Sequence, residues 1–179
     1  MLDRLQINIE YSNTEDRLLL RICGMESQGE CVEYRFWLTR RFVSIFIQAI
    51  DKLISDCLAA DMQVSPDALE AMKKFQQEAA LAKADFSTPY GAFSEDCTLI
   101  GEAPFLAATL KIQKKSKDRF VLSLLTVDNE GINLAADLDI IHTLRKMIVA
   151  SVDNAGWNQP VSGEAGKELK AAESSLRMS

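Results

Sequence analysis

The residues best suited to chemistry are few and far apart along the chain. The four cysteines are Cys23, Cys31, Cys57 and Cys97, and they form no CxxC pair and have no histidine near them. Zinc sites and redox motifs usually show cysteines paired at short spacing. The spacing therefore predicts reduced thiols and no metal site. Cys23 and Cys31 flank a predicted turn and can face each other across a hairpin, which alone is weak evidence for a disulfide.

Residues for catalysis are equally sparse. The single histidine, His142, lies in a predicted helix near the border of its apolar face, which is more typical of a packed residue than of a general base. The chain contains no GxSxG, P-loop, GxGxxG or HExxH pattern, and its eight glycines are not clustered. Paired acids occur in predicted turns or helix starts, where capping explains them. We therefore expect no enzyme activity and no cofactor.

The segment from Tyr34 to Phe46 mixes aromatic residues with arginines and is a candidate binding surface. We expect Arg35 and Trp37 on the outward face of a strand, followed by Arg40 and Arg41 in the first turn of a helix. Proteins that bind single-stranded nucleic acid place such cations beside aromatic side chains. Single-strand binding is therefore one hypothesis for this surface.

A predicted hairpin in the second half of the chain adds to the same hypothesis. Its cations are Lys111, Lys114, Lys115, Lys117 and Arg119. The alternative is that these lysines form a solvated turn, while Arg35 and Trp37 pair with strand neighbours such as Arg21 or Glu33. The net charge of −6 and the pI of about 4.9 disfavour a dedicated duplex-DNA binder.

Arg40 and Arg41 stand where a helix has a partial positive charge, so basic side chains are disfavoured there. A carboxylate or a bound anion would offset the repulsion. Glu33, Glu102 and the acids of residues 85–96 are eligible, and we expect an internal ion pair rather than a bound anion.

The hydrophobic pattern predicts three strands, over residues 5–11, 17–25 and 31–38, and then a change of period. Thr39 stands at a helix N-cap position, and apolar residues then recur at helical spacing to about Ala60. The apolar stripe of this first helix is wider than one sheet buries. The surplus must be covered by another helix or by a second subunit, so homodimerisation is a reasonable expectation.

A second helix is predicted to begin at Ser65 and Pro66. Its expected buried side is Leu69, Met72, Phe75, Ala79 and Ala82. A loop over residues 85–96 follows.

The second half repeats the layout of the first. We predict a short strand at 97–102, strands at 104–115 and 119–128, a further apolar stretch at 132–138, and a helix from about Asp137 to Asn154. Aligning Leu38 with Leu134 superposes the two strand-to-helix junctions roughly, WLTRRFVSIF on NLAADLDIIH.

The fold class predicted is therefore α+β, with antiparallel strands packed against three helices in the order βββ-αα-βββ(β)-α. Residues 1–157 form a single domain, and the polar residues 158–179 form a flexible tail. No segment has the apolar length of a membrane span. The N-terminal residues carry acids where a signal peptide is apolar, so we expect a cytoplasmic protein.

Three motifs resemble a group of uncharacterised proteobacterial proteins: EYRFWLTRR at 33–41, AKADFSTPY at 82–90, and GE-P at 101–104. The resemblance covers most of residues 1–157 and implies no activity. In element order alone, the chain also resembles the head domains of end-joining scaffold and centriole cartwheel proteins, which dimerise and assemble, but it lacks their long coiled coil. Two-repeat sheet-and-helix proteins that bind single strands are a comparable analogy.

The sequence thus favours a non-enzymatic interaction or assembly protein that self-associates or binds a protein partner. The alternative is a single-stranded nucleic-acid-binding protein that uses the outward strand face and the basic hairpin.

Overall fold

The computed structural model describes residues 3–26, 29–61, 66–84, 90, 97–116 and 118–158. The elements follow in the order β1 (Asp3–Ser12), β2 (Arg17–Met25), β3 (Cys31–Leu38), α1 (Arg40–Asp61), α2 (Pro66–Lys83), β4 (Thr98–Leu106), β5 (Thr109–Lys114), β6 (Phe120–Leu125), β7 (Gly131–Ala136) and α3 (Leu138–Asn154). The predicted α+β class and element order are confirmed. None of the helices described has the length and hydrophobicity needed to cross a membrane.

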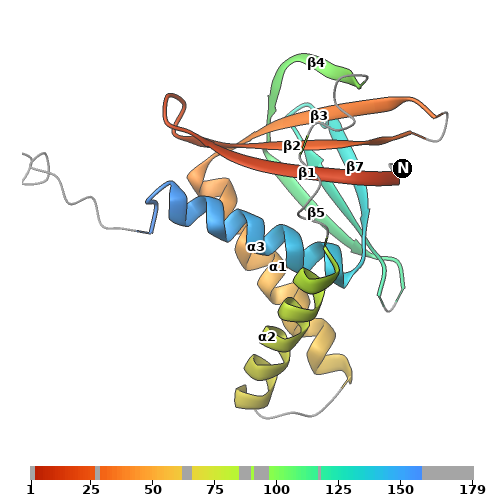
Figure 1. Cartoon of the computed structure of the whole chain (residues 1–179), viewed down its shortest axis with the longest axis vertical. Coiled ribbons are helices and arrows are strands. Elements are labelled where there is room, and N and C mark those ends of the chain that lie inside the picture. Colours follow the sequence, from red (N-terminus) through yellow and green to blue (C-terminus); the bar gives the residue numbers. More distant parts are fainter. Residues whose placement is uncertain are drawn as a thin grey trace, which may run out of the picture.

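The strands form two sheets, ordered β1-β2-β3-β4 and β5-β6-β7 (Figure 1). All pairings are antiparallel except that of β3 with β4, which is parallel. The prediction of antiparallel strands is wrong for this one pair. Its physical reason is the long connection through α1 and α2, which returns the chain in the same direction.

Residues 104–115 were predicted as one strand, but the chain changes sheets within them. The amide of Ala107 donates to the carbonyl of Trp37 in the first sheet, at 3.0 Å, and the amide of Ala108 donates to Leu125 in the second, at 2.9 Å. Two adjacent residues therefore divide the predicted strand into β4 and β5.

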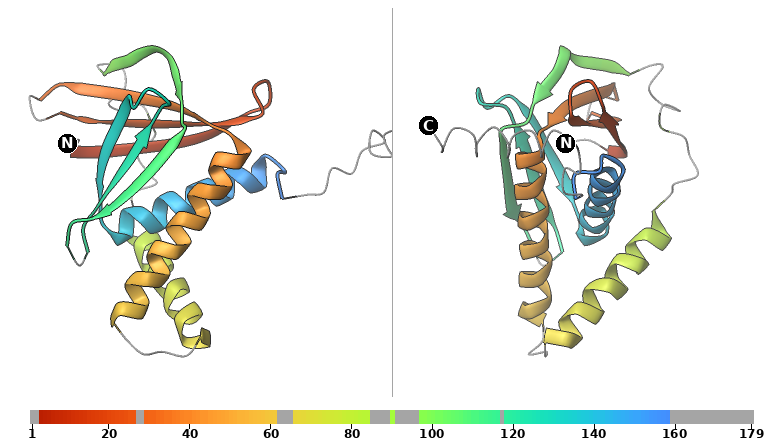
Figure 2. Two further views of the ribbon diagram at one scale, coloured as in Figure 1. Left: turned by 180° about the vertical axis from the view of Figure 1, so that it is seen from behind. Right: turned by 90° about the vertical axis from the view of Figure 1, so that its left-hand side faces the viewer.

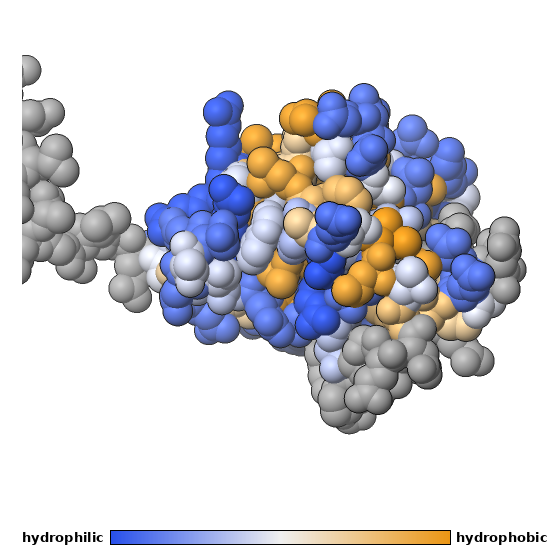
Figure 3. Space-filling model, turned by 90° about the horizontal axis from the view of Figure 1, so that it is seen from above, coloured by the Kyte–Doolittle hydropathy of each residue, from blue (hydrophilic) through white to orange (hydrophobic). Residues whose placement is uncertain are grey.

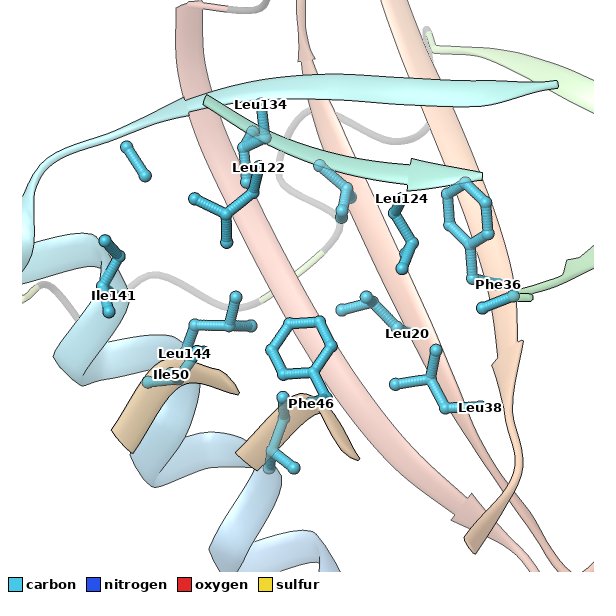
Figure 4. Packing of buried hydrophobic residues seen from close by; sticks show 14 of the residues in the cluster. Leu20, Phe36, Leu38, Phe46, Ile50, Leu122, Leu124, Leu134, Ile141 and Leu144 are labelled. Carbon is cyan, nitrogen blue, oxygen red and sulfur yellow. The ribbon is translucent and has the colours of Figure 1, made fainter. Parts of the chain in front are cut away.

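One hydrophobic cluster joins both sheets to α1 and α3. Figure 4 shows its members converging: Leu20, Phe36 and Leu38 from the first sheet, Leu122, Leu124 and Leu134 from the second, Phe46 and Ile50 from α1, and Ile141 and Leu144 from α3. In Figure 2 the helices lie on one side of the sheets, and α1 and α2 extend away from them as a helical hairpin.

The second helix is rotated relative to the prediction. Phe75, expected on the buried side, is 72% exposed, while Ala80 is buried at 1%. Ala82 is also exposed, whereas Met72 packs against the core as expected. The error arose because the apolar residues of α2 are mostly alanines, which define a face weakly. The predicted cap Ser65 lies outside the described residues.

The two strand-to-helix junctions correspond, but two residues away from the predicted alignment. Thr39 Oγ1 accepts a hydrogen bond from the Phe42 amide at 3.2 Å, and Asp137 Oδ1 accepts one from the Ile140 amide at 2.9 Å. Both residues are N-caps, which confirms the prediction for Thr39. Superposing the caps places Leu38 on Ala136 rather than on Leu134.

Candidate functional site: the outer face of the four-stranded sheet

The first sheet buries polar residues on the face that points away from the core. Its alternation places Leu20 and Phe36 inward and Arg21, Cys23 and Glu33 outward. An outward face of an antiparallel sheet is commonly solvated. Here Glu33 is only 1% exposed and Cys23 is also 1% exposed. The packing of the core therefore does not explain why Glu33 and Cys23 are buried on this outer face.

Three of the four cysteines meet on this face. Register places Cys31 diagonally beside Cys23, and Cys97 stands directly before β4, whose Thr98 pairs with Val32. The Sγ atom of Cys23 lies 2.9 Å from that of Cys97 and 3.4 Å from that of Cys31. Cys31 and Cys97 are joined as a disulfide.

These positions correct two predictions, that the cysteines are dispersed and that their thiols are all reduced. The predicted approach of Cys23 and Cys31 across the hairpin is confirmed, but the disulfide joins Cys31 to Cys97, which are 66 residues apart. Spacing gave no signal for this, because the β3–β4 pairing follows a long helical connection. The sequence did indicate one part of this arrangement: in the strand alternation, Cys23 and Cys31 both occupy outward positions and so lie on the same face of the sheet.

An ion pair lies beside the cysteines. The guanidinium of Arg21 donates to both carboxylate oxygens of Glu33, from Nε at 3.0 Å and from Nη2 at 3.4 Å. The ring of Tyr90 lies over this guanidinium, with its centroid 4.6 Å away. A buried carboxylate needs such a counter-charge, because leaving it unpaired costs several kcal/mol.

Burial and this ion pair change the proton affinities of the neighbouring groups. The hydrogen bond to Glu33 raises the pKa of Arg21. Burial, followed by the negative charge of Glu33, raises the pKa of the Tyr90 hydroxyl. Burial and the same charge also raise the pKa of the Cys23 thiol, against a smaller lowering by Arg21. These groups are therefore protonated at neutral pH.

Among the residues that the structure describes, four buried polar atoms of the outer face have no hydrogen-bond partner. They are Gln6 Oε1, Asn8 Oδ1, Arg35 Nε and the Tyr90 hydroxyl. Gln6 pairs in register with Cys23, and Asn8 with Arg21, so both share this face. Native structures satisfy nearly all buried polar atoms, so four such atoms on one face distinguish it from the rest of the fold.

Arg35 is held within the chain. One of its terminal nitrogens donates to the carbonyl of Gly101 at 2.8 Å and to that of Glu102 at 3.3 Å. Trp37, the other outward residue predicted on β3, is half-buried and pairs in register with Leu19. Neither side chain presents a fully open surface for a base or a phosphate.

Arg40 pairs with an internal acid. Its guanidinium donates to Asp16 Oδ1 at 3.1 Å and lies over the ring of Trp157, 5.2 Å from the centroid. The same oxygen accepts from the Tyr11 hydroxyl at 2.9 Å and from Trp157 Nε1 at 3.0 Å. The internal ion pair predicted for Arg40 is confirmed, with Asp16 as the acid in place of those we named.

Asp16 is the centre of this second cluster. Hydrogen bonds from Trp157, Arg40 and Tyr11, in that order, hold the pKa of its carboxyl below the usual range. The neighbouring Arg41 is exposed and has no ion-pair partner in the described part of the chain.

The basic hairpin is separate from the arginines of the junction. Among its predicted residues Lys111, Lys114, Lys115 and Arg119 are exposed, and Lys117 lies outside the described residues. Figures 1 and 2 both show the β5–β6 turn at the opposite end of the sheets from the start of α1. The fold therefore does not bring the predicted nucleic-acid residues onto one surface.

His142 is a packed residue of α3. It is 2% exposed, and its buried Nε2 atom has no hydrogen-bond partner within the described part of the chain. Burial, then the charge of Arg145, lowers the pKa of its imidazole. The ring is therefore neutral at physiological pH.

Comparisons with protein-family models, with curated proteins and with solved structures found no significant match. The resemblance drawn from the motifs therefore stays a prediction, and the function must be argued from the residues themselves.

Proposed function

We propose that this chain is a non-enzymatic interaction and assembly protein that self-associates through the free edge of β1. The observation that carries the proposal is a difference between the two edge strands of the four-stranded sheet. Natural proteins protect exposed strand edges with bulges, proline and charges, since an unprotected edge is a template for another strand.

The β4 edge is protected in this way. Its pairing with β3 is interrupted between Tyr34 and Phe36. The interruption spans residues 101–104 of β4 and contains both Gly101, at φ 83°, and Pro104. Leu99 and Leu106 are exposed on β4 at 52% and 47%, but Figure 3, seen from the β4 side, shows the hydrophobic surface divided by hydrophilic side chains.

The β1 edge is less protected: its pairing with β2 has one irregularity, between Asp3 and Gln6, near the start of the strand. The strand has ten residues without glycine or proline, and its register with β2 is regular from Gln6 to Ser12. Within the described chain it pairs only with β2. Its outer row of backbone amides and carbonyls has no second strand partner in the described chain, although α3 also contacts β1, and this row is the edge that the proposed dimer pairs.

The sequence of β1 is complementary to itself when two copies run antiparallel about Ile7. Leu5 then stands opposite Ile9 of the second copy, and Gln6 opposite Asn8, whose amides both donate and accept. Glu10 stands opposite residue 4, an arginine in the sequence. A twofold axis repeats every pair, as a closed dimer requires.

The wide apolar stripe of α1 does not support self-association. Its surplus is covered by α2 and α3, which both contact it. Of its large apolar side chains only Ile45 is exposed, at 52%, in the part of α1 whose side chains are described. The proposal rests on the β1 edge instead.

The test is a charge reversal at the predicted pair. Glu10→Lys would place two like charges opposite each other twice per dimer, and we expect roughly tenfold weaker dimerisation from about 1.4 kcal/mol of lost pairing summed over the two pairs. The double variant Arg4→Glu/Glu10→Lys restores the attraction and should recover the wild-type dissociation constant. Sedimentation equilibrium measures all three.

Glu130→Lys makes the same charge change at an exposed turn and serves as the control. A wild-type protein that stays monomeric at high concentration would overturn the proposal. So would a Glu10→Lys variant that dimerises as tightly as the Glu130→Lys control.

A further inference from the structure

The cluster of Cys23, Cys31 and Cys97 contains one cysteine more than a disulfide uses. The three residues come from β2, from the first position of β3 and from the position before β4. Their sulfur atoms all lie within 4.8 Å of one another. Three thiols from separate parts of the chain thus lie together at one point of the outer face.

We propose that this cluster, in its reduced state, is a binding site for one Zn²⁺ ion. Reduction of the Cys31–Cys97 disulfide by a dithiol or phosphine reductant consumes two electrons and two protons and gives three thiols. Binding of the metal then releases three protons, because each ligand binds as a thiolate. The product is a tris-thiolate zinc centre with one negative charge.

Donor type and separation both suit zinc. Thiolates are soft ligands, and zinc bound by cysteine has Zn–S distances of about 2.3 Å in a tetrahedral arrangement. Such a centre separates its sulfur atoms by roughly 3.8 Å. The Cys23 sulfur lies 2.9 and 3.4 Å from the other two, so the three side chains must spread slightly once the disulfide is reduced. Hard cations such as Mg²⁺ prefer oxygen ligands, and the sulfur-only donor set disfavours them.

The surroundings shield the cluster from water and place an ion pair beside it. Cys23 is 1% exposed, so a metal bound to its sulfur would have little contact with water. Arg21, on the same face, has its positive charge paired with Glu33. Both carboxylate oxygens of Glu33 accept hydrogen bonds from Arg21, so Glu33 is not a fourth ligand of the zinc ion. The fourth position of the tetrahedral ion is therefore left to a further ligand.

The experiment compares two cysteine variants of the full chain under a phosphine reductant. Wild type and Cys57→Ser, which removes the cysteine of α1 outside the cluster, should each bind one Zn²⁺ per chain. Cys23→Ser should bind zinc at least about 100-fold more weakly, since one of three ligands is lost. A chromophoric zinc chelator measures the affinity by competition.

Cobalt gives an independent readout of ligand type. Co²⁺ bound to wild type and to Cys57→Ser should show a thiolate-to-metal charge-transfer band in the near ultraviolet, and this band should be lost in Cys23→Ser. Cys97→Ser should behave like Cys23→Ser and provides a second variant in case one of them fails to fold, which circular dichroism detects.

Two results would overturn the inference. One is reduced wild-type protein that binds no stoichiometric zinc. The other is a folded Cys23→Ser variant that binds zinc as tightly as Cys57→Ser does, which would mean that the cluster serves only the Cys31–Cys97 disulfide.

Discussion

The two halves of the molecule share a plan, and they differ in what they do with the outer face of their sheets. Each half is a three-stranded antiparallel meander followed by a capped helix, β1-β2-β3-α1 and β5-β6-β7-α3. Buried positions of the two helices correspond at a constant offset: Val43 with Ile141, Phe46 with Leu144, Ile50 with Ile148, and Ile54 with Val152. The two helices therefore bury equivalent positions against the inner faces of the sheets.

The outer faces are different. On the second sheet the outward row is Lys111, Ser123 and Asn133, of which Lys111 and Asn133 are exposed. On the first sheet Glu33 and Cys23 are buried. The second half folds without a buried charge on the outer face of its sheet. A buried charge at this place is therefore not required by the shared fold. The difference is the reason why the proposed zinc site is placed on the outer face of the first sheet.

Equivalent core truncations would test the shared plan and should have the largest effect. Ile50 and Ile148 are both 0% exposed. We expect Ile50→Ala and Ile148→Ala each to lower the free energy of unfolding by about 3 kcal/mol, through lost burial and a residual cavity. Chemical denaturation measures both. A loss confined to one variant would show that the two halves are not packed equivalently.

Removal of the buried carboxylate would sharpen the difference between the outer faces. Glu33→Ala leaves Arg21 without its partner, and we expect a loss of about 2 kcal/mol in the free energy of unfolding. Gln113→Ala, at an exposed outward position of the second sheet, should change it by less than about 0.5 kcal/mol. Equal effects in the two variants would remove the argument that the first face is special.

The smallest effect concerns the two junctions. Asp16 accepts hydrogen bonds beside the first junction, and the second has the cap Asp137. Because folding lowers the pKa of Asp16, its contribution to stability is complete above the ordinary aspartate pKa of about 3.9 and is lost as pH falls through the lower folded value.

Asp16→Asn tests this sign. The difference in unfolding free energy between wild type and Asp16→Asn should be constant above about pH 5 and shrink below about pH 4. A difference that is independent of pH down to acid unfolding would contradict the role of the carboxylate charge.

Local patterns predicted the elements well, because each depends on residues close in sequence. Period-2 alternation located β1 and β3, and a nearly continuous apolar run located β2. Thr39 marked the start of α1 through the hydrogen bond that it accepts from the amide three residues on. The alanine-rich pattern of α2 was too weak to orient the helix, and Phe75 was placed on the wrong side.

The sequence by itself determined the α+β class, the order of the elements and the face of β3 to which each residue belongs, since strand parity is a local property. Only the tertiary structure decided which outward residues meet. The parallel pairing of β3 with β4 closes a connection of 59 residues, from Thr39 to Cys97, and no local preference encodes such a contact. That pairing brings Cys97 to Cys31 and Cys23, and it turns dispersed thiols into a cluster.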